Sequence, residues 1–105
     1  MIKRRERKRI YSDTERNAVN EEFVMKIVIV DDDCLVTGAL KTILEANEDV
    51  DVVATGLDGR DAVRLYGEHK PDVLLMDIRM KNMNGLEAAT EILYAYPEAN
   101  ILLLT

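Results

Sequence analysis

Short apolar runs alternate with amphipathic stretches along this chain from Met25 onward. The apolar runs are rich in β-branched and aliphatic residues, which is typical of buried strands. The predicted strands are Lys26–Val30, Val50–Ala54, Asp72–Met76 and Ile101–Leu104. The stretches between them repeat apolar residues near a period of 3.6, which predicts helices. The predicted helices are Leu35–Ala46, Asp58 or Gly59 to His69, and Leu86–Tyr96.

Each predicted helix has an apolar face, and two of the three have a recognisable end. The faces comprise Leu35, Ala39, Ile43 and Ala46, widened by Leu40 and Leu44, in the first helix; Ala62, Leu65 and Tyr66 in the second; and Leu86, Ala89, Ile92 and Leu93 in the third. Lys70-Pro71 ends the second helix, because a residue before proline is disfavoured in the α region. Asn84 is a suitable N-cap for the third.

Strand and helix alternation with nearly continuous apolar strands predicts an α/β fold. Such strands are buried on both faces, which requires a parallel sheet between two layers of helices. The connecting helices should then form right-handed crossovers.

Acidic residues stand where two of the strands end. Asp31, Asp32 and Asp33 follow the first strand, and Asp77 follows the third. The carboxyl ends of parallel strands lie at one edge, so these groups converge if the two strands are neighbours. Converging carboxylates repel one another, and a hard cation such as Mg²⁺ relieves that repulsion. An aspartate can also accept a phosphoryl group. Taken alone, a triple Asp is more often a loop or helix-capping run, and Asp33 is expected to cap the following helix.

Charge and composition add a boundary near Met25. The chain has 105 residues and a net charge of −6, enough for one small domain. Residues 1–24 carry +2, and we expect them to form a charged, disordered extension. This extension would be either solvated or, at Lys3–Arg9, a nucleic-acid-binding arm; alternatively, Met25 is the true start. Residues 25–105 carry −8, which argues against nucleic-acid binding by this segment itself. A single cysteine, and no apolar run of signal-peptide or membrane-spanning type, predict a cytoplasmic protein without membrane contact.

The acidic motifs resemble those of a known family. Val30-Asp31-Asp32, Leu75-Met76-Asp77-Ile78-Arg79-Met80 and Met83-Asn84-Gly85 are similar to the receiver domain of bacterial two-component response regulators, most of all those with a LuxR-type helix-turn-helix output. The resemblance runs from Met25 to Thr105. It implies a flavodoxin-like doubly wound parallel sheet, and it makes residues 25–105 a partial receiver domain that ends at the fourth strand.

The resemblance also implies a role for each site residue. Asp77 would accept a phosphoryl group from a sensor histidine kinase. Asp32 would bind Mg²⁺ directly and Asp31 through water, with Asp77 and the backbone carbonyl of Arg79 as further ligands. The Thr105 hydroxyl would contact the phosphoryl group. The protein would be a signalling switch rather than an enzyme, and would reach DNA only through an output domain that this sequence lacks.

Departures from the family pattern leave alternatives open. Lys81 stands where the family usually has proline, and the fifth strand with its lysine and the last two helices are missing. We therefore expect a marginal chain that self-associates through the exposed edge of Ile101–Leu104. One alternative is a truncated interaction module that is not phosphorylated. A phosphatase of the haloacid-dehalogenase type fits less well, because its second aspartate would fall at Arg79.

Overall fold

A four-stranded parallel sheet forms the centre of the protein, with strand order β2-β1-β3-β4. The structure, a computed structural model, describes residues 23–105. The elements are, in chain order, β1 (Met25–Val30), α3 (Cys34–Glu45), β2 (Val50–Gly56), α4 (Gly59–His69), β3 (Val73–Asp77), α5 (Gly85–Ala95) and β4 (Ile101–Leu104). The predicted elements are all present, and their ends differ from the prediction by at most two residues. The predicted extension at residues 1–24 lies, apart from its last two residues, outside the described part of the chain.

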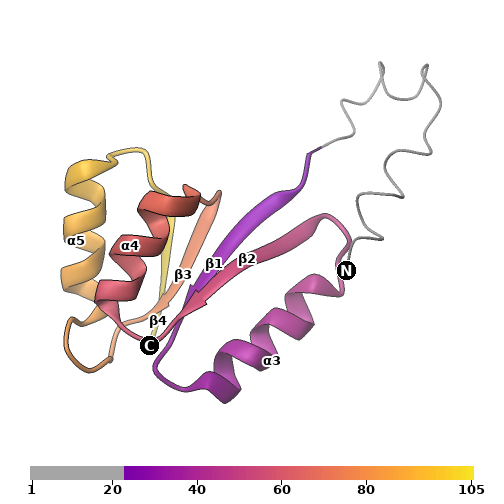
Figure 1. Cartoon of the computed structure of the whole chain (residues 1–105), viewed down its shortest axis with the longest axis horizontal. Helices are drawn as coiled ribbons and strands as arrows, with labels where there is room; N and C mark the ends of the chain where they lie inside the picture. The colour runs from indigo at the N-terminus through magenta and orange to yellow at the C-terminus, as the bar shows by residue number, and fades with distance from the viewer. Residues whose placement is uncertain (1–22) are drawn as a thin grey trace.

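Helices cover both faces of the sheet. Helices α4 and α5 lie on one face and α3 on the other (Figure 1). Alternate residues of each strand point to opposite faces, so Val28 and Val30 contact the α4–α5 side while Ile27 and Ile29 contact the α3 side. The predicted two-sided α/β fold is thus confirmed. No helix within residues 23–105 is long and apolar enough to cross a membrane.

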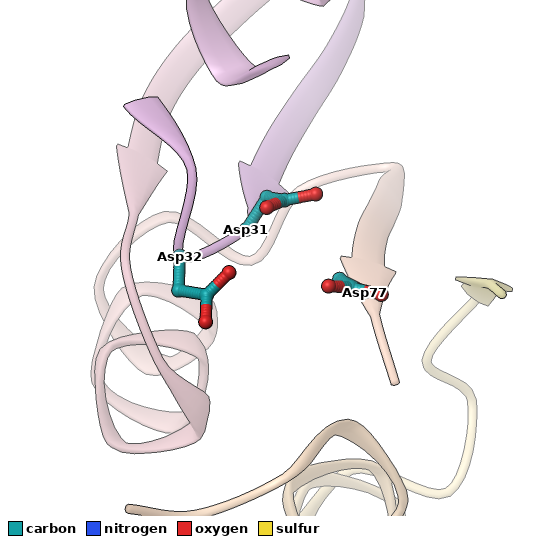
Figure 2. Close-up of side chains that lie close together, drawn as sticks. All are labelled: Asp31, Asp32 and Asp77. Atoms are coloured by element: carbon teal, nitrogen blue, oxygen red, sulfur yellow. The ribbon is translucent and has the colours of Figure 1, made fainter. Parts of the chain in front are cut away.

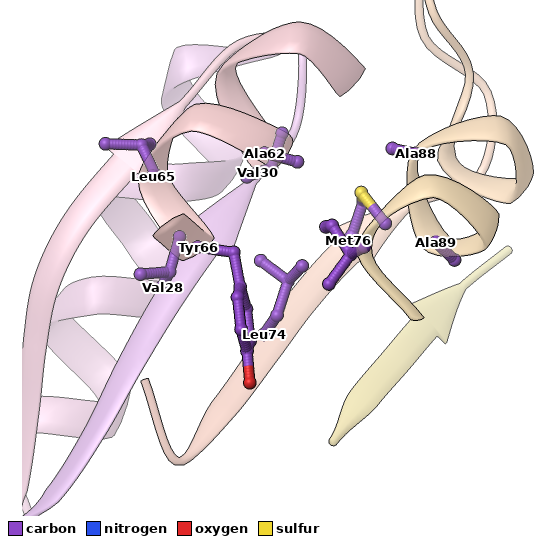
Figure 3. Packing of buried hydrophobic residues seen from close by; sticks show 10 residues of the cluster. Val28, Val30, Ala62, Leu65, Tyr66, Leu74, Met76, Ala88 and Ala89 are labelled. Carbon is purple, nitrogen blue, oxygen red and sulfur yellow. The ribbon is translucent and has the colours of Figure 1, made fainter. Parts of the chain in front are cut away.

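The larger core lies between the sheet and helices α4 and α5. Leu74 and Met76 of β3 are fully buried there, between Tyr66 and its neighbours on α4 and the small residues Ala88 and Ala89 of α5 (Figure 3). Burial of one large aliphatic side chain contributes about 1.5–3 kcal/mol. This packing holds β3 rigidly, and β3 carries Asp77 at its end.

The apolar face predicted for the first helix was only partly right. Leu35 and Ile43 are 79% and 66% exposed, and Ala39 and Ala46 are exposed as well. Leu40 and Leu44, which were also part of the predicted face, do pack against the sheet, together with Thr37, which was not predicted. Apolar residues surround much of this helix, so its periodicity alone could not identify the packed face. Within the described residues, α3 packs mainly on β1 and β2, and Leu35 and Ile43 on its other side remain exposed.

The other helix faces were predicted better. Ala62, Leu65 and Tyr66 of α4 are all buried, as expected. In α5, Ala89 and Ile92 are buried together with Ala88, whereas Leu86 and Leu93 are 54% and 41% exposed, contrary to the prediction. Helix α5 covers the sheet through a narrow face of mostly small residues, so the outer leucines stay at the surface.

Candidate metal and phosphoryl site

Three carboxylates meet at the carboxyl edge of the sheet. Asp31 and Asp32 directly follow β1, and Asp77 is the last residue of β3. One oxygen from each side chain lies within 4.8 Å of the others. Figure 2 shows the three groups around a common space at the ends of the two strands. The structure therefore brings together the acidic residues that the sequence singled out.

The sheet register explains why these residues meet. Strands β1 and β3 are parallel neighbours, and Val30 pairs with Met76. The residues that follow this pair, Asp31 and Asp77, therefore lie at the same level of the sheet edge. The backbone amide of Asp31 donates to the Gly56 carbonyl at 3.1 Å, which extends the β1–β2 ladder to the edge. The acids are thus positioned by the ends of a rigid sheet.

The turn after β1 orders the cluster further. Asp33 caps α3, accepting a hydrogen bond from the amide of Leu35 at 2.9 Å, so the predicted capping role is confirmed. The amide of Asp33 in turn donates to Oδ1 of Asp31 at 2.9 Å. One oxygen of Asp31 is thereby committed to the backbone, and Asp33 is turned toward the helix rather than the cluster.

The site is electrostatically unfavourable for the ionised carboxylate of Asp31. Burial raises the pKa of Asp31 above its ordinary value; the hydrogen bond from Asp33 opposes this, and repulsion from Asp77, Asp32 and Asp33 adds to it. Among residues 23–105, the ion pairs join Arg64 to Asp61 and Glu68, and no cationic side chain is paired with the cluster. A bound cation would therefore stabilise this edge.

The donor set fits a hard divalent cation. All three side chains offer carboxylate oxygens, which are the ligands that Mg²⁺ and Ca²⁺ prefer. Mg²⁺ usually takes only one or two carboxylates and keeps several waters, and this open edge leaves space for them. The residues present fit Mg²⁺ without requiring any further side-chain ligand.

The remaining predicted site residues lie at the same edge of the sheet. Arg79 is exposed, two residues beyond Asp77, and its amide donates to Oδ1 of Asp77 over a long 3.4 Å. Thr105 is exposed and follows Leu104, the β4 residue that pairs with Asp77. Arg79 is thus close to the cluster along the chain, and Thr105 is brought to the same edge by the pairing of β3 with β4.

The sequence analysis included Gly85 in a family motif but gave it no role, and the structure shows that it starts α5 beside the acceptor strand. Its amide donates to the Ile78 carbonyl at 2.8 Å. A Cβ on this residue would collide with the carbonyl oxygen of Asp77 and lie 2.9 Å from the Cα of Ile78. A glycine directly after the N-cap Asn84 was the available signal, since that position does not otherwise require one.

Neutralising one acid should stabilise the metal-free chain. Because the pKa of Asp31 is raised on folding, its destabilising effect is absent at low pH and grows from about pH 4 upward. We expect Asp31→Asn to increase the free energy of unfolding by about 0.5 kcal/mol at pH 7 without Mg²⁺, and by less at pH 4. Urea unfolding in EDTA at both pH values measures this. Equal or lower stability of the variant at pH 7 would contradict it.

Comparisons with known proteins agree with this geometry. The family model described as "Response regulator receiver domain" matches residues 27–105. The transcriptional regulatory protein DegU of Brevibacillus brevis is 42% identical over 87 residues, which are 83% of this chain and 36% of that protein. The oxygen regulatory protein NreC of Staphylococcus haemolyticus is 48% identical over 82 residues, 77% of this chain and 38% of that protein. The chain thus spans less than half the length of these relatives.

Solved structures show the same fold. The response regulator domain of Thermotoga maritima CheB superposes with a TM-score of 0.73 at 38% identity, over 76% of this chain and 59% of that chain. The signal receiver domain of the putative response regulator NarL from Mycobacterium tuberculosis gives a TM-score of 0.71 at 32% identity, over 77% of this chain and 65% of that chain.

Proposed function

Because the chain belongs to the response regulator receiver domain family, we propose that it accepts a phosphoryl group on Asp77 from a sensor histidine kinase and thereby acts as a switch in two-component signalling. The observation that carries this proposal is the convergence of Asp31, Asp32 and Asp77 at one edge of the sheet. A carboxylate nucleophile beside two further acids suits phosphoryl transfer that depends on a divalent cation.

The acids have different roles in this proposal. Asp32 would bind Mg²⁺ directly and Asp31 through a water molecule, while Asp77 and the backbone carbonyl of Arg79 would complete the protein ligands. When bound, Mg²⁺ would offset the negative charge of the carboxylates and of the incoming phosphoryl group. The existing bond from Asp33 to Asp31 supports the indirect role of Asp31, because it already occupies one of that carboxylate's oxygens.

The transfer itself is a displacement at phosphorus. A carboxylate oxygen of Asp77 forms the new P–O bond while the P–N bond to the kinase histidine breaks; the imidazole nitrogen keeps the electron pair and takes a proton from solvent. The Thr105 hydroxyl then donates a hydrogen bond to a phosphoryl oxygen. Thr105 follows Leu104, the residue paired with Asp77, so this change would be felt at the end of β4.

The proposed output is control of transcription. Relatives named for transcriptional or oxygen regulation are more than twice as long as the matched segment. We therefore place DNA binding in another region of a longer, LuxR-type protein, and the switch in the cytoplasm beside its kinase. Self-association through β4 also stays a prediction; in the described sheet, β4 is an edge strand.

Phosphorylation by a small-molecule donor tests this proposal. The chain is incubated with acetyl phosphate, with Mg²⁺ or with EDTA, and the intact mass and the peptide containing Asp77 are measured. We expect one phosphoryl adduct, on Asp77, that depends on Mg²⁺. Folded protein without an adduct would favour the interaction module, and an adduct equally abundant in EDTA would remove the metal from the mechanism.

A further inference from the structure

We propose that Asn82 and Asp58 are positioning residues for this site, because together they tie the loop after β3 to the start of α4. The inference deepens the proposed function and rests on it, since the loop includes Arg79, whose carbonyl is a proposed Mg²⁺ ligand. Neither Asn82 nor Asp58 touches the metal or the phosphoryl group in this proposal. They act through the shape of the loop.

The tie is a side-chain hydrogen bond between distant parts of the sequence. Nδ2 of Asn82 donates to Oδ2 of Asp58 at 2.9 Å, across 24 residues. Beside it, the amide of Gly59 donates to the Met83 carbonyl at 2.9 Å. The loop is thus fastened to α4 by one side-chain bond and one backbone bond at successive residues.

Asp58 is suited to hold two partners at once. It is the N-cap of α4, and its Oδ1 accepts from the amide of Asp61 at 2.9 Å, which leaves Oδ2 for Asn82. These two hydrogen bonds, that of Asp61 first, hold the pKa of Asp58 below its ordinary value. A charged acceptor makes a stronger hydrogen bond than a neutral one.

Asn82, the loop residue of this hydrogen bond, has an uncommon backbone conformation. Asn82 has φ of 65°, the left-handed region that asparagine tolerates better than most residues. Contact with α4 is close here, since a Cβ on Gly59 would lie 2.6 Å from Cγ of Met83. The bond to Asp58 therefore helps to hold a backbone turn that few side chains would adopt without support.

The attachment points of the loop fix the position of Arg79. The amide of Gly85 donates to the Ile78 carbonyl and so closes the base of the loop, while Asn82 and Met83 attach its tip to α4. Arg79 lies between these anchors, three residues before Asn82, and its own amide makes only a long bond to Asp77. The direction of the Arg79 carbonyl is thus set by the anchors rather than by a local bond.

Variants that remove the tie and keep the local structure test this inference. Asn82→Gly keeps access to positive φ and loses the donor. Asp58→Ser keeps an N-cap oxygen and loses the second acceptor. Calorimetric titration with Mg²⁺ alone should show a dissociation constant raised about tenfold in each, as is typical when groups that orient metal ligands are lost. The double variant should bind Mg²⁺ no more weakly than either single variant.

An exchanged pair separates positioning from general damage. Asn82→Asp sets two carboxylates against each other and should weaken Mg²⁺ binding, although added negative charge alone would strengthen it. Combining it with Asp58→Asn restores a hydrogen bond with donor and acceptor exchanged and returns the net charge to its original value. We expect Mg²⁺ affinity to recover in this pair. Asn100→Ala, which removes an amide at the opposite end of the sheet, serves as the matched control.

A readout without metal distinguishes the two possible failures. Hydrogen exchange of the Gly59 amide in EDTA should be about tenfold faster in Asn82→Gly and unchanged in Asn100→Ala. If the unaltered chain binds no Mg²⁺, the proposed metal site fails, and unchanged Gly59 exchange would then also overturn the tie. If the unaltered chain binds Mg²⁺ and the tie variants bind it equally well, the proposed function stands and the positioning role is overturned.

Discussion

Replacing Asp77 by asparagine should abolish phosphorylation of this chain while leaving it folded. The amide has the shape of the carboxylate, and its oxygen can still accept the bond from the Arg79 amide. It is no longer an anionic nucleophile, so the adduct from acetyl phosphate should fall roughly a thousandfold or more, below detection by intact-mass measurement. Removing one of the charges that raise the pKa of Asp31 should also increase stability in EDTA.

The matched control is the same change at the other end of β3. Asp72 precedes this strand, and its Oδ2 accepts from the Lys26 amide at 2.7 Å, a bond that asparagine can keep. Asp72→Asn should therefore be phosphorylated as readily as the unaltered chain. An adduct that persists in Asp77→Asn would place the acceptor elsewhere, and equal loss in both variants would indicate a general effect of charge.

The acidic site could be predicted from the sequence because its signal is local. An apolar run that ends in acid identifies a strand end, and two such runs identify Asp31, Asp32 and Asp77. The sequence could predict that these two strand ends meet only on the condition that β1 and β3 are neighbours. Strand order depends on tertiary packing, and here β1 lies between β2 and β3.

Other features had no readable signal. The bond between Asp58 and Asn82 joins two surface loops, and nothing in either loop's own sequence names its partner. The packed face of α3 was predicted only in part, for a different reason. Leu35 and Leu40 are equally apolar, and only contact with Ile27 and its neighbours decides that Leu40 faces the sheet. Periodicity gives the existence of a helix more securely than its orientation.

The largest effect on stability is expected from adding a single methyl group at Gly85. The new Cβ would meet backbone atoms of Asp77 and Ile78, which belong to the end of β3 and cannot move aside as a flexible side chain could. We expect Gly85→Ala to lower the free energy of unfolding by about 3 kcal/mol, at the upper end of overpacking costs. The hydrogen bond from the Gly85 amide to the Ile78 carbonyl should be strained by the same displacement.

Gly38→Ala is the control that isolates this collision from the change of residue type. A Cβ at Gly38 meets nothing within 4 Å, and the residue lies inside α3. Alanine is favoured over glycine in a helix interior by about 1 kcal/mol, so this variant should be more stable than the unaltered chain. Urea unfolding of both variants measures the two opposite shifts. Shifts of the same sign would mean that Gly85 is not in close contact with β3.

Because the backbone of Asp77 must move to make room for the new methyl group, Gly85→Ala should also slow phosphorylation under conditions where the variant remains folded. Gly38→Ala should not slow it.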